Sequence, residues 1–212
     1  MSAGWADTVL WWHVYPLGFT GAPVRPEAAE QVPVPRLDRL HAWLDHVVEL
    51  GLNGLALGPV FASQTHGYDT VDHLRVDPRL GTEDDLQRLI DACAERGIRV
   101  LLDGVFNHVG RGHPTFAQLE AEGPAAPTAG VFRVDWTGWR PGDPVRADVF
   151  EGHEQLVALD HASPAVADLV VGVLRHWLDR GIDGWRLDAA YAVPPEFWAR
   201  GLPEGRRTHP DA

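Results

Sequence analysis

The stretch Gly-Ile-Arg-Val-Leu-Leu-Asp at residues 97–103 decides the fold, because it joins the end of a helix to a buried strand. Residues 83–96 carry apolar side chains at helical spacing behind Thr82, a residue type that often caps a helix start. Gly97 is typical of a helix end, and the short apolar run after it favours a strand covered on both faces. We therefore predict a helix over 83–96 followed by a strand that ends at Asp103.

The same order of helix, glycine and apolar run occurs twice more along the chain. A helix over 36–50 precedes the apolar residues 52–57, and a helix over 163–180 precedes the apolar residues 182–188. Residues 8–15 add a fourth strand candidate. Strands that alternate with helices build right-handed crossovers and a parallel sheet. We therefore predict an α/β fold whose four strands lie side by side in sequence order.

Residues 109–160 interrupt this alternation of helices and strands. They are rich in glycine and proline, and they are far longer than the roughly 2–6 residues of ordinary βα loops. Long insertions on a rigid scaffold usually shape a binding site. We therefore predict one α/β domain made of residues 1–108 and 161–212, with residues 109–160 as an inserted subdomain between the third strand and the third helix.

The composition describes an acidic globular protein and excludes several classes of function. The 212 residues carry a formal net charge of -12, which argues against nucleic acid and anionic membranes as partners. No apolar run approaches the roughly 18 residues of a membrane span, and residues 1–7 lack a basic stretch followed by an apolar one. Cys93 is the single cysteine, so the chain forms no internal disulfide. We therefore expect a cytoplasmic protein with no nucleic-acid or membrane partner.

Two neighbouring predicted strands end in an aspartate, Asp103 in one and Asp188 in the other. Active sites of parallel α/β folds lie at the carboxyl ends of the strands, although aspartate also ends strands as a simple turn residue. Arg186 points to the same face as Asp188, two residues later, and a buried arginine needs an anionic partner. A carboxylate held ionised in this way is a nucleophile or a cation ligand, and the alternative is a structural ion pair. Asn107 and His108 lie just past the first of these strands, where they can reach the same site.

Four motifs in this order resemble those of one enzyme family, the α-amylase-type enzymes of glycoside hydrolase family 13. Residues 103–108 (Asp-Gly-Val-Phe-Asn-His) resemble the family's first region, and residues 184–188 (Gly-Trp-Arg-Leu-Asp) resemble its second, with Trp in place of Phe. Residues 66–70 resemble the Gly-Tyr-Asp stretch after the second strand, and residues 159–160 resemble a segment near the end of the family's inserted domain. The resemblance implies a (β/α)8 TIM barrel of which these residues supply the first four β/α units, because a complete barrel needs about 250 residues.

The resemblance also implies roles for the residues that match its motifs. Asp188 corresponds to the nucleophile of a retaining hydrolase or transglycosylase acting on α-glucosidic bonds, and Arg186 would keep it ionised and oriented. The substrate would be an α-linked glucose oligosaccharide or glucoside. The residues that bind the sugar would be Tyr68, Asp103 and His108.

The resemblance implies no required cofactor and one candidate calcium ligand. Asn107 matches a position that binds calcium in many α-amylases. Those enzymes add a histidine four residues after the nucleophile, where this chain has Ala192. The departure argues against calcium and favours the α-glucosidase, oligosaccharide-transferase or maltose-converting branches of the family.

A retaining glycosidase also needs a general acid, which in this family is a glutamate at the end of the fifth strand. We expect that glutamate and the rest of the barrel beyond Ala212, because Glu196 and Glu204 fall in a predicted fourth helix and in the loop after it. An unclosed sheet has exposed edges, which predict association of these residues and little or no glycosidase activity of the chain alone.

Two other functions compete with this reading. The first is a non-catalytic sugar-binding half-barrel that assembles with a partner chain, and the intact pair of Arg186 and Asp188 argues against it. The second is a metal-dependent hydrolase with Asp103 and Asp188 as ligands, and the chain lacks the His-x-His spacing that such sites use.

Overall fold

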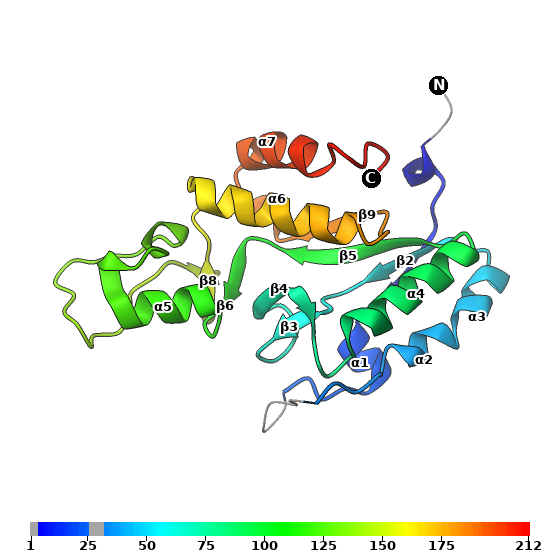
Figure 1. Ribbon diagram of the computed structural model, residues 1–212, viewed down its shortest axis with the longest axis horizontal. Coiled ribbons are helices and arrows are strands. Elements are labelled where there is room, and N and C mark those ends of the chain that lie inside the picture. Colours follow the sequence, from blue (N-terminus) through cyan, green and yellow to red (C-terminus); the bar gives the residue numbers. More distant parts are fainter. Residues whose placement is uncertain (1–3, 26–31) are drawn as a thin grey trace.

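A four-stranded parallel sheet forms the centre of the protein (Figure 1). The computed structural model describes residues 4–25 and 32–212. The strands follow one another in the order β1 (Trp11–Val14), β2 (Gly54–Leu57), β5 (Arg99–Val105) and β9 (Gly184–Asp188). The predicted parallel sheet in sequence order is therefore confirmed, and within the described residues β1 and β9 are its two edges.

The longer helices lie beside this sheet, as the sequence predicted for two of them. α4 (Glu83–Glu95) begins at Thr82, which closes a capping box. α6 (Pro164–Leu178) begins with a proline, whose fixed φ suits the first helical position. α7 (Pro195–Gly205) packs against α6 (Figure 1). Glu204 therefore lies inside α7, and the prediction that it follows the helix was wrong.

The helix predicted over 36–50 is two short helices, α2 (Asp38–His41) and α3 (Leu44–Glu49). The break falls at Trp43. Its backbone N–H donates to the carbonyl of the residue three positions earlier, instead of four positions earlier as in an α-helix. Its ring lies beside that of Trp12, with centroids 6.4 Å apart. The prediction of one continuous helix was wrong because the local turn tightens where this indole packs towards β1.

An antiparallel hairpin that the sequence pattern did not predict lies between β2 and α4. Its strands are β3 (Phe61–Ser63) and β4 (Thr70–Val76), and residues 64–69 form the connecting loop. The backbone carbonyl of buried His73 in β4 accepts a hydrogen bond of 2.8 Å from the Trp177 indole in α6. The hairpin is therefore anchored to the helical layer.

Residues 108–158 build a second, antiparallel sheet at one end of the molecule. Its strands lie in the order β6 (His108–Gly110), β8 (His153–Ala158) and β7 (Val149–Phe150), and α5 (Pro114–Glu122) follows β6. The remaining elements are short: α1 (Pro16–Thr20), η1 (Trp5–Asp7), η2 (Gly123–Ala125), η3 (Ala129–Val131) and η4 (Ala190–Ala192). Figure 1 shows α5, β6 and β8 far from the two chain ends, on the side to which the end of β5 points.

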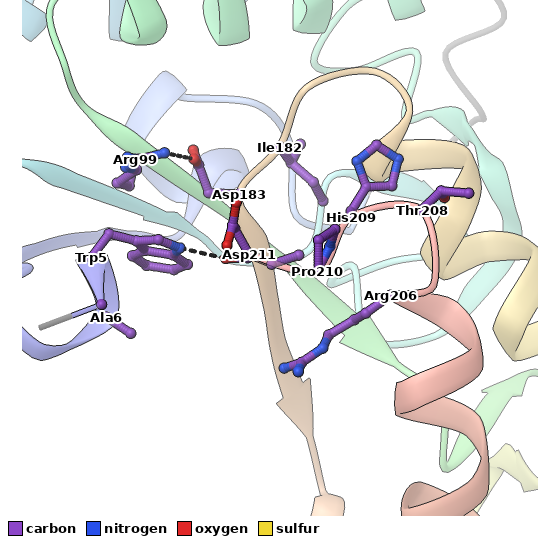
Figure 2. A pocket seen from close by; sticks show the side chains of 12 residues that line it. Trp5, Ala6, Arg99, Ile182, Asp183, Arg206, Thr208, His209, Pro210 and Asp211 are labelled. Carbon is purple, nitrogen blue, oxygen red and sulfur yellow. Dashed lines mark hydrogen bonds and ion pairs between the residues drawn. The ribbon is translucent and has the colours of Figure 1, made fainter. Parts of the chain in front are cut away.

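A cavity of about 770 Å³ lies at the opposite end of the sheet, where the strands begin (Figure 2). The Trp5 indole donates to the carbonyl of Asp211 at 2.6 Å there, which joins the two ends of the described chain. Arg99, at the start of β5, forms an ion pair of 2.5 Å with Asp183. In barrels of parallel strands this end contributes to stability, whereas the chemistry lies at the carboxyl ends.

The sequence predicted that no segment spans a membrane and that residues 1–7 form no leader. Among residues 4–25 and 32–212, no helix combines the length and the apolar character that crossing a bilayer requires. Residues 1–3, part of the segment in which we expected no leader, lie outside the described residues.

Candidate active site

One arginine joins two aspartates at the carboxyl end of the sheet. Arg186 in β9 lies directly opposite Asp103 in β5, and its Nη1 donates to both oxygens of that carboxylate at 2.8 and 2.6 Å. The same nitrogen donates to Asp188 Oδ1 at 2.9 Å, because residues two apart on a strand share a face. The structure thus brings three predicted site residues together.

The burial of the three side chains corrects one prediction, and the strand pairing corrects another. Asp103 is 0% exposed, Asp188 is 16% exposed and Arg186 is 44% exposed. The prediction of a buried arginine was wrong, because Arg186 lies on an edge strand whose outer side no described strand covers. The prediction that the strand ends at Asp103 was also wrong, since β5 continues to Val105, which pairs with Asp188.

The electrostatics of the cluster follow from this burial. Burial raises the pKa of the Asp103 carboxyl to about 6, against the opposing effect of the Arg186 charge. Partial burial disfavours the charge of Arg186, yet the nearby carboxylates raise the pKa of the guanidinium overall. Burial and then the Asp103 carboxylate raise the pKa of the Tyr68 phenol. Near neutral pH the cluster therefore holds an ion pair beside a neutral phenol.

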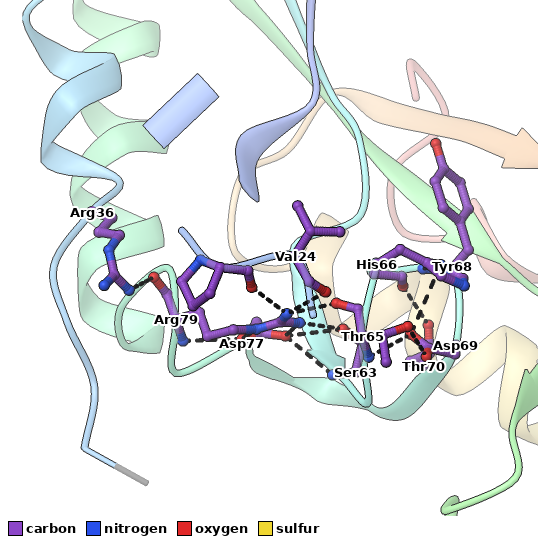
Figure 3. A network of polar contacts seen from close by, with 12 residues as sticks. Val24, Arg36, Ser63, Thr65, His66, Tyr68, Asp69, Thr70, Asp77 and Arg79 are labelled. Atoms are coloured by element: carbon purple, nitrogen blue, oxygen red, sulfur yellow. Dashed lines mark hydrogen bonds and ion pairs between the residues drawn. The ribbon is translucent and has the colours of Figure 1, made fainter. Parts of the chain in front are cut away.

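Tyr68 and His108 stand beside this cluster on segments that connect the strands. His108 Nε2 donates to the backbone carbonyl of Tyr68 at 3.1 Å, and burial lowers the pKa of the imidazole. The ring of His108 stacks on Phe150 at the end of β7, with centroids 4.7 Å apart. Figure 3 shows the Tyr68 ring turned away from the polar network of its own loop. The side chain of His108 is thus linked to the backbone of Tyr68, the other predicted sugar-binding residue.

Asn107 is the predicted calcium ligand, and in this structure its side chain contacts His108. Its side chain is buried, and its Nδ2 donates to His108 Nδ1 at 3.3 Å. In the part of the chain that the structure describes, no group of three or more His, Cys, Asp or Glu side chains is placed to hold a metal ion. Asn107 is therefore a partner of His108 in this structure, and its role as a calcium ligand stays a prediction.

Two residues near the site were not predicted from the sequence, Glu151 and Tyr191. Tyr191 follows Asp188 by three residues and is 77% exposed, and its hydroxyl donates to Glu151 Oε1 at 2.6 Å. Glu151 lies in the turn between β7 and β8, where its backbone has φ 48°. No local pattern could reveal this contact, because 40 residues separate the two side chains.

A parallel α/β sheet with charged residues gathered at the carboxyl ends of its strands is the arrangement in which α/β enzymes place their active sites. The sequence profile of the family described as "Alpha amylase, catalytic domain" matches residues 36–211. The chain therefore belongs to the α-amylase catalytic-domain family, and the resemblance found in its motifs is confirmed.

Relatives of this chain in the family are hydrolases of α-glucans. Cyclomaltodextrinase of a Bacillus species is 31% identical over 223 residues, which cover 98% of this chain and 40% of that protein. Intracellular maltogenic amylase of Bacillus subtilis is 28% identical over 210 residues, which cover 92% of this chain and 35% of that protein. Ligand-free cyclic α-maltosyl-(1→6)-maltose hydrolase of Arthrobacter globiformis superposes with a TM-score of 0.85 at 29% identity, over 99% of this chain and 50% of that one. The chain thus spans well under two thirds of the length of these relatives.

Proposed function

We propose that this chain carries the nucleophile side of the active site of a retaining α-glucoside hydrolase or transglycosylase. The observation that carries this proposal is the single Arg186 nitrogen that donates to Asp103 and Asp188 where the strands end. In a retaining enzyme one carboxylate attacks the anomeric carbon and forms a covalent glycosyl-enzyme intermediate. We assign that role to Asp188, because it is the more exposed of the two carboxylates.

Arg186 orients Asp188 for this attack. Its donation to Oδ1 leaves Oδ2 to approach the anomeric carbon. The new bond joins Oδ2 to the anomeric carbon while the bond to the leaving oxygen breaks, and that electron pair stays on the leaving oxygen. Tyr68 and His108 border the sugar, whereas the fully buried side chain of Asp103 is bound by Arg186.

The leaving oxygen needs a proton, and we place the general acid on a glutamate outside these 212 residues. Glu196 and Glu204 lie in α7, which packs against α6 and contributes no side chain to the cluster of Arg186. Asp103 is unsuited to the task, because both its oxygens accept from Arg186.

The proposed architecture is a (β/α)8 barrel of which this chain supplies four units. Residues 1–108 and 161–212 belong to the barrel, and residues 109–160 are the inserted subdomain. The four-stranded parallel sheet and the coverage of 40% of cyclomaltodextrinase support this division. The edge strands β1 and β9 would meet the remaining strands of the barrel.

The proposed substrate is an α-linked glucose oligosaccharide or glucoside, and the proposed location is the cytoplasm. The related cyclic α-maltosyl-(1→6)-maltose hydrolase has been solved with maltose, and one relative is named as an intracellular amylase. The flat face of Tyr68 suits the apolar face of a sugar ring. The chemistry assigned to Asp188 and Arg186 uses no cofactor.

Trapping of the glycosyl-enzyme tests the nucleophile directly. In 5-fluoro-α-glucosyl fluoride the leaving group is fluoride, which departs without a proton, so the attack does not depend on the general acid. We expect the mass of the chain to rise by one fluoroglucosyl group, with the label on Asp188. Asp188→Asn should abolish the adduct, and Asp183→Asn, at the opposite end of the sheet, should not.

An adduct on another residue would overturn the assignment of Asp188. Binding of maltotriose without any adduct is the result expected of the other candidate, a non-catalytic sugar-binding half-barrel that assembles with a partner chain. The two functions are therefore separated by one pair of measurements, the mass of the treated chain and its affinity for maltotriose.

A further inference from the structure

Arg79 is a buried arginine outside the active site whose hydrogen bonds converge on the loop that carries Tyr68 (Figure 3). Its side chain is 3% exposed and forms an ion pair of 2.6 Å with Asp77, which is 2% exposed. Nε and Nη2 donate to the two oxygens of Asp77, so the two groups meet as a planar fork. Such a pair contributes little net stability, because both charges lose their hydration.

The other hydrogen bonds of Arg79 hold the backbone where the loop begins. Nη1 donates to the carbonyl of Thr65 at 2.5 Å and to the carbonyl of Pro23 at 2.9 Å. Nη2 donates to Ser63 Oγ at 2.7 Å, at the end of β3. The first residues of the loop are thus fixed from the interior of the protein.

Thr65 connects the hydrogen bonds of Arg79 to the residue next to Tyr68. The N–H and the hydroxyl of Thr65 donate to the two oxygens of Asp69, at 3.0 and 2.6 Å. Asp69 is buried and directly follows Tyr68, whose carbonyl accepts from His108 Nε2. Hydrogen bonds therefore join Arg79 through Thr65 to Asp69, and the peptide bond between Asp69 and Tyr68 completes the connection to Tyr68 and His108.

We propose that Arg79 is a positioning residue of the active site, which sets the orientation of the Tyr68 ring and the tautomer of His108 through Thr65 and Asp69. The inference rests on the proposed function only in the statement that a sugar contacts Tyr68. A lysine at position 79 would keep the charge but present one donor group, which cannot bind Asp77, Ser63 and Thr65 in one plane.

The test compares Arg79→Lys with Arg99→Lys, which alters an ion pair at the opposite end of the sheet. NMR would record the ring signals of Tyr68, one of three tyrosines, together with the ring nitrogens of His108. Arg79→Lys should shift or broaden both sets of signals while the indole N–H of Trp177 in the core stays unchanged. The affinity for maltotriose should fall about threefold to tenfold, the effect of roughly one hydrogen bond. Arg99→Lys should change none of these.

Unchanged signals of Tyr68 and His108 in folded Arg79→Lys would overturn the inference. If that variant does not fold, Thr65→Val decides, because it removes the hydroxyl bond to Asp69 and leaves the ion pair intact. Shifted Tyr68 and His108 signals in Thr65→Val support the inference, and unchanged signals overturn it. A wild-type chain that binds no maltotriose contradicts the proposed function alone, because the NMR signals report the positioning without a sugar.

Discussion

Arg186 faces Asp103 across two neighbouring strands and donates to both oxygens of that fully buried carboxylate. Arg186→Gln should therefore destabilise the fold by about 2 kcal/mol near pH 8, because it leaves Asp103 charged and buried without a cation. Near pH 5 the cost should be smaller, since the Asp103 carboxyl has a pKa of about 6 and is then protonated. Denaturant unfolding at the two pH values measures both costs.

The sign of this pH dependence follows from linkage. A carboxyl whose pKa rises on folding contributes stability that is complete below its unfolded pKa and is lost as the pH rises through its folded pKa. In Arg186→Gln the stability contributed by the Asp103 carboxyl should continue to fall to higher pH. Adding Asp103→Asn to this variant should abolish the pH dependence. An equal cost of Arg186→Gln at both pH values would mean that the cost does not arise from Asp103.

His113 should make the fold sensitive to acid. Burial lowers the pKa of His113 from 6.5 to about 4, with help from His73 and against the effect of Asp72. Its neutral Nδ1 accepts the N–H of Thr115 at 3.2 Å. Stability should be complete above pH 6.5 and fall by about 3 kcal/mol at most towards pH 4, where only the unfolded state gains the proton. Urea unfolding across this range should show a smaller fall in His113→Gln, and the full fall in His153→Gln, a change at an exposed position.

Cys93 should resist alkylation while the protein is folded. It is 0% exposed on the apolar face of α4, and burial raises the pKa of its thiol to about 12. The thiolate, which is the reactive form, is therefore scarce and inaccessible. Iodoacetamide should label the chain only as denaturant opens it, and mass spectrometry reads the result directly because there is one cysteine. Rapid labelling of the native chain would contradict the packing of α4.

The edge strands β1 and β9 should drive association of the chain. Each pairs with one neighbour among the described strands, so the other side presents unpaired backbone groups. Sedimentation velocity should show species that grow with concentration. Leu10→Lys, which adds a charge beside β1 at an exposed leucine, should reduce association more than Leu74→Lys on the β3–β4 hairpin. A monomer at all concentrations would contradict this prediction.

The strand order could be predicted because its signals are local. Gly97 ends one helix and the apolar run after it becomes β5, and the same succession leads into β9. The contact between Arg186 and Asp188 could also be predicted, since a strand places residues two apart on one face. These features depend on residues that are close in sequence.

The rest depends on segments that meet only in the folded chain. The exposure of Arg186 is set by which strand lies beyond β9, and residue spacing carries no information on that point. Phe150 contacts His108 from the distant strand β7, and Arg79 contacts Thr65 across the β3–β4 hairpin. Such contacts appear in the sequence only as isolated polar or aromatic residues.

Asp188→Asn tests the assignment of Asp188 as the nucleophile, in a longer protein that contains this chain and the rest of the barrel. Asparagine keeps an oxygen for Arg186 but loses the charge and the nucleophile, so maltotriose turnover should fall by at least about a thousandfold. Binding should change by less than about threefold, because the sugar contacts of Tyr68 and His108 remain. Asp183→Asn, whose carboxylate pairs with Arg99 at the other end of β9, should keep turnover. Substantial turnover by Asp188→Asn would show that another group attacks the anomeric carbon.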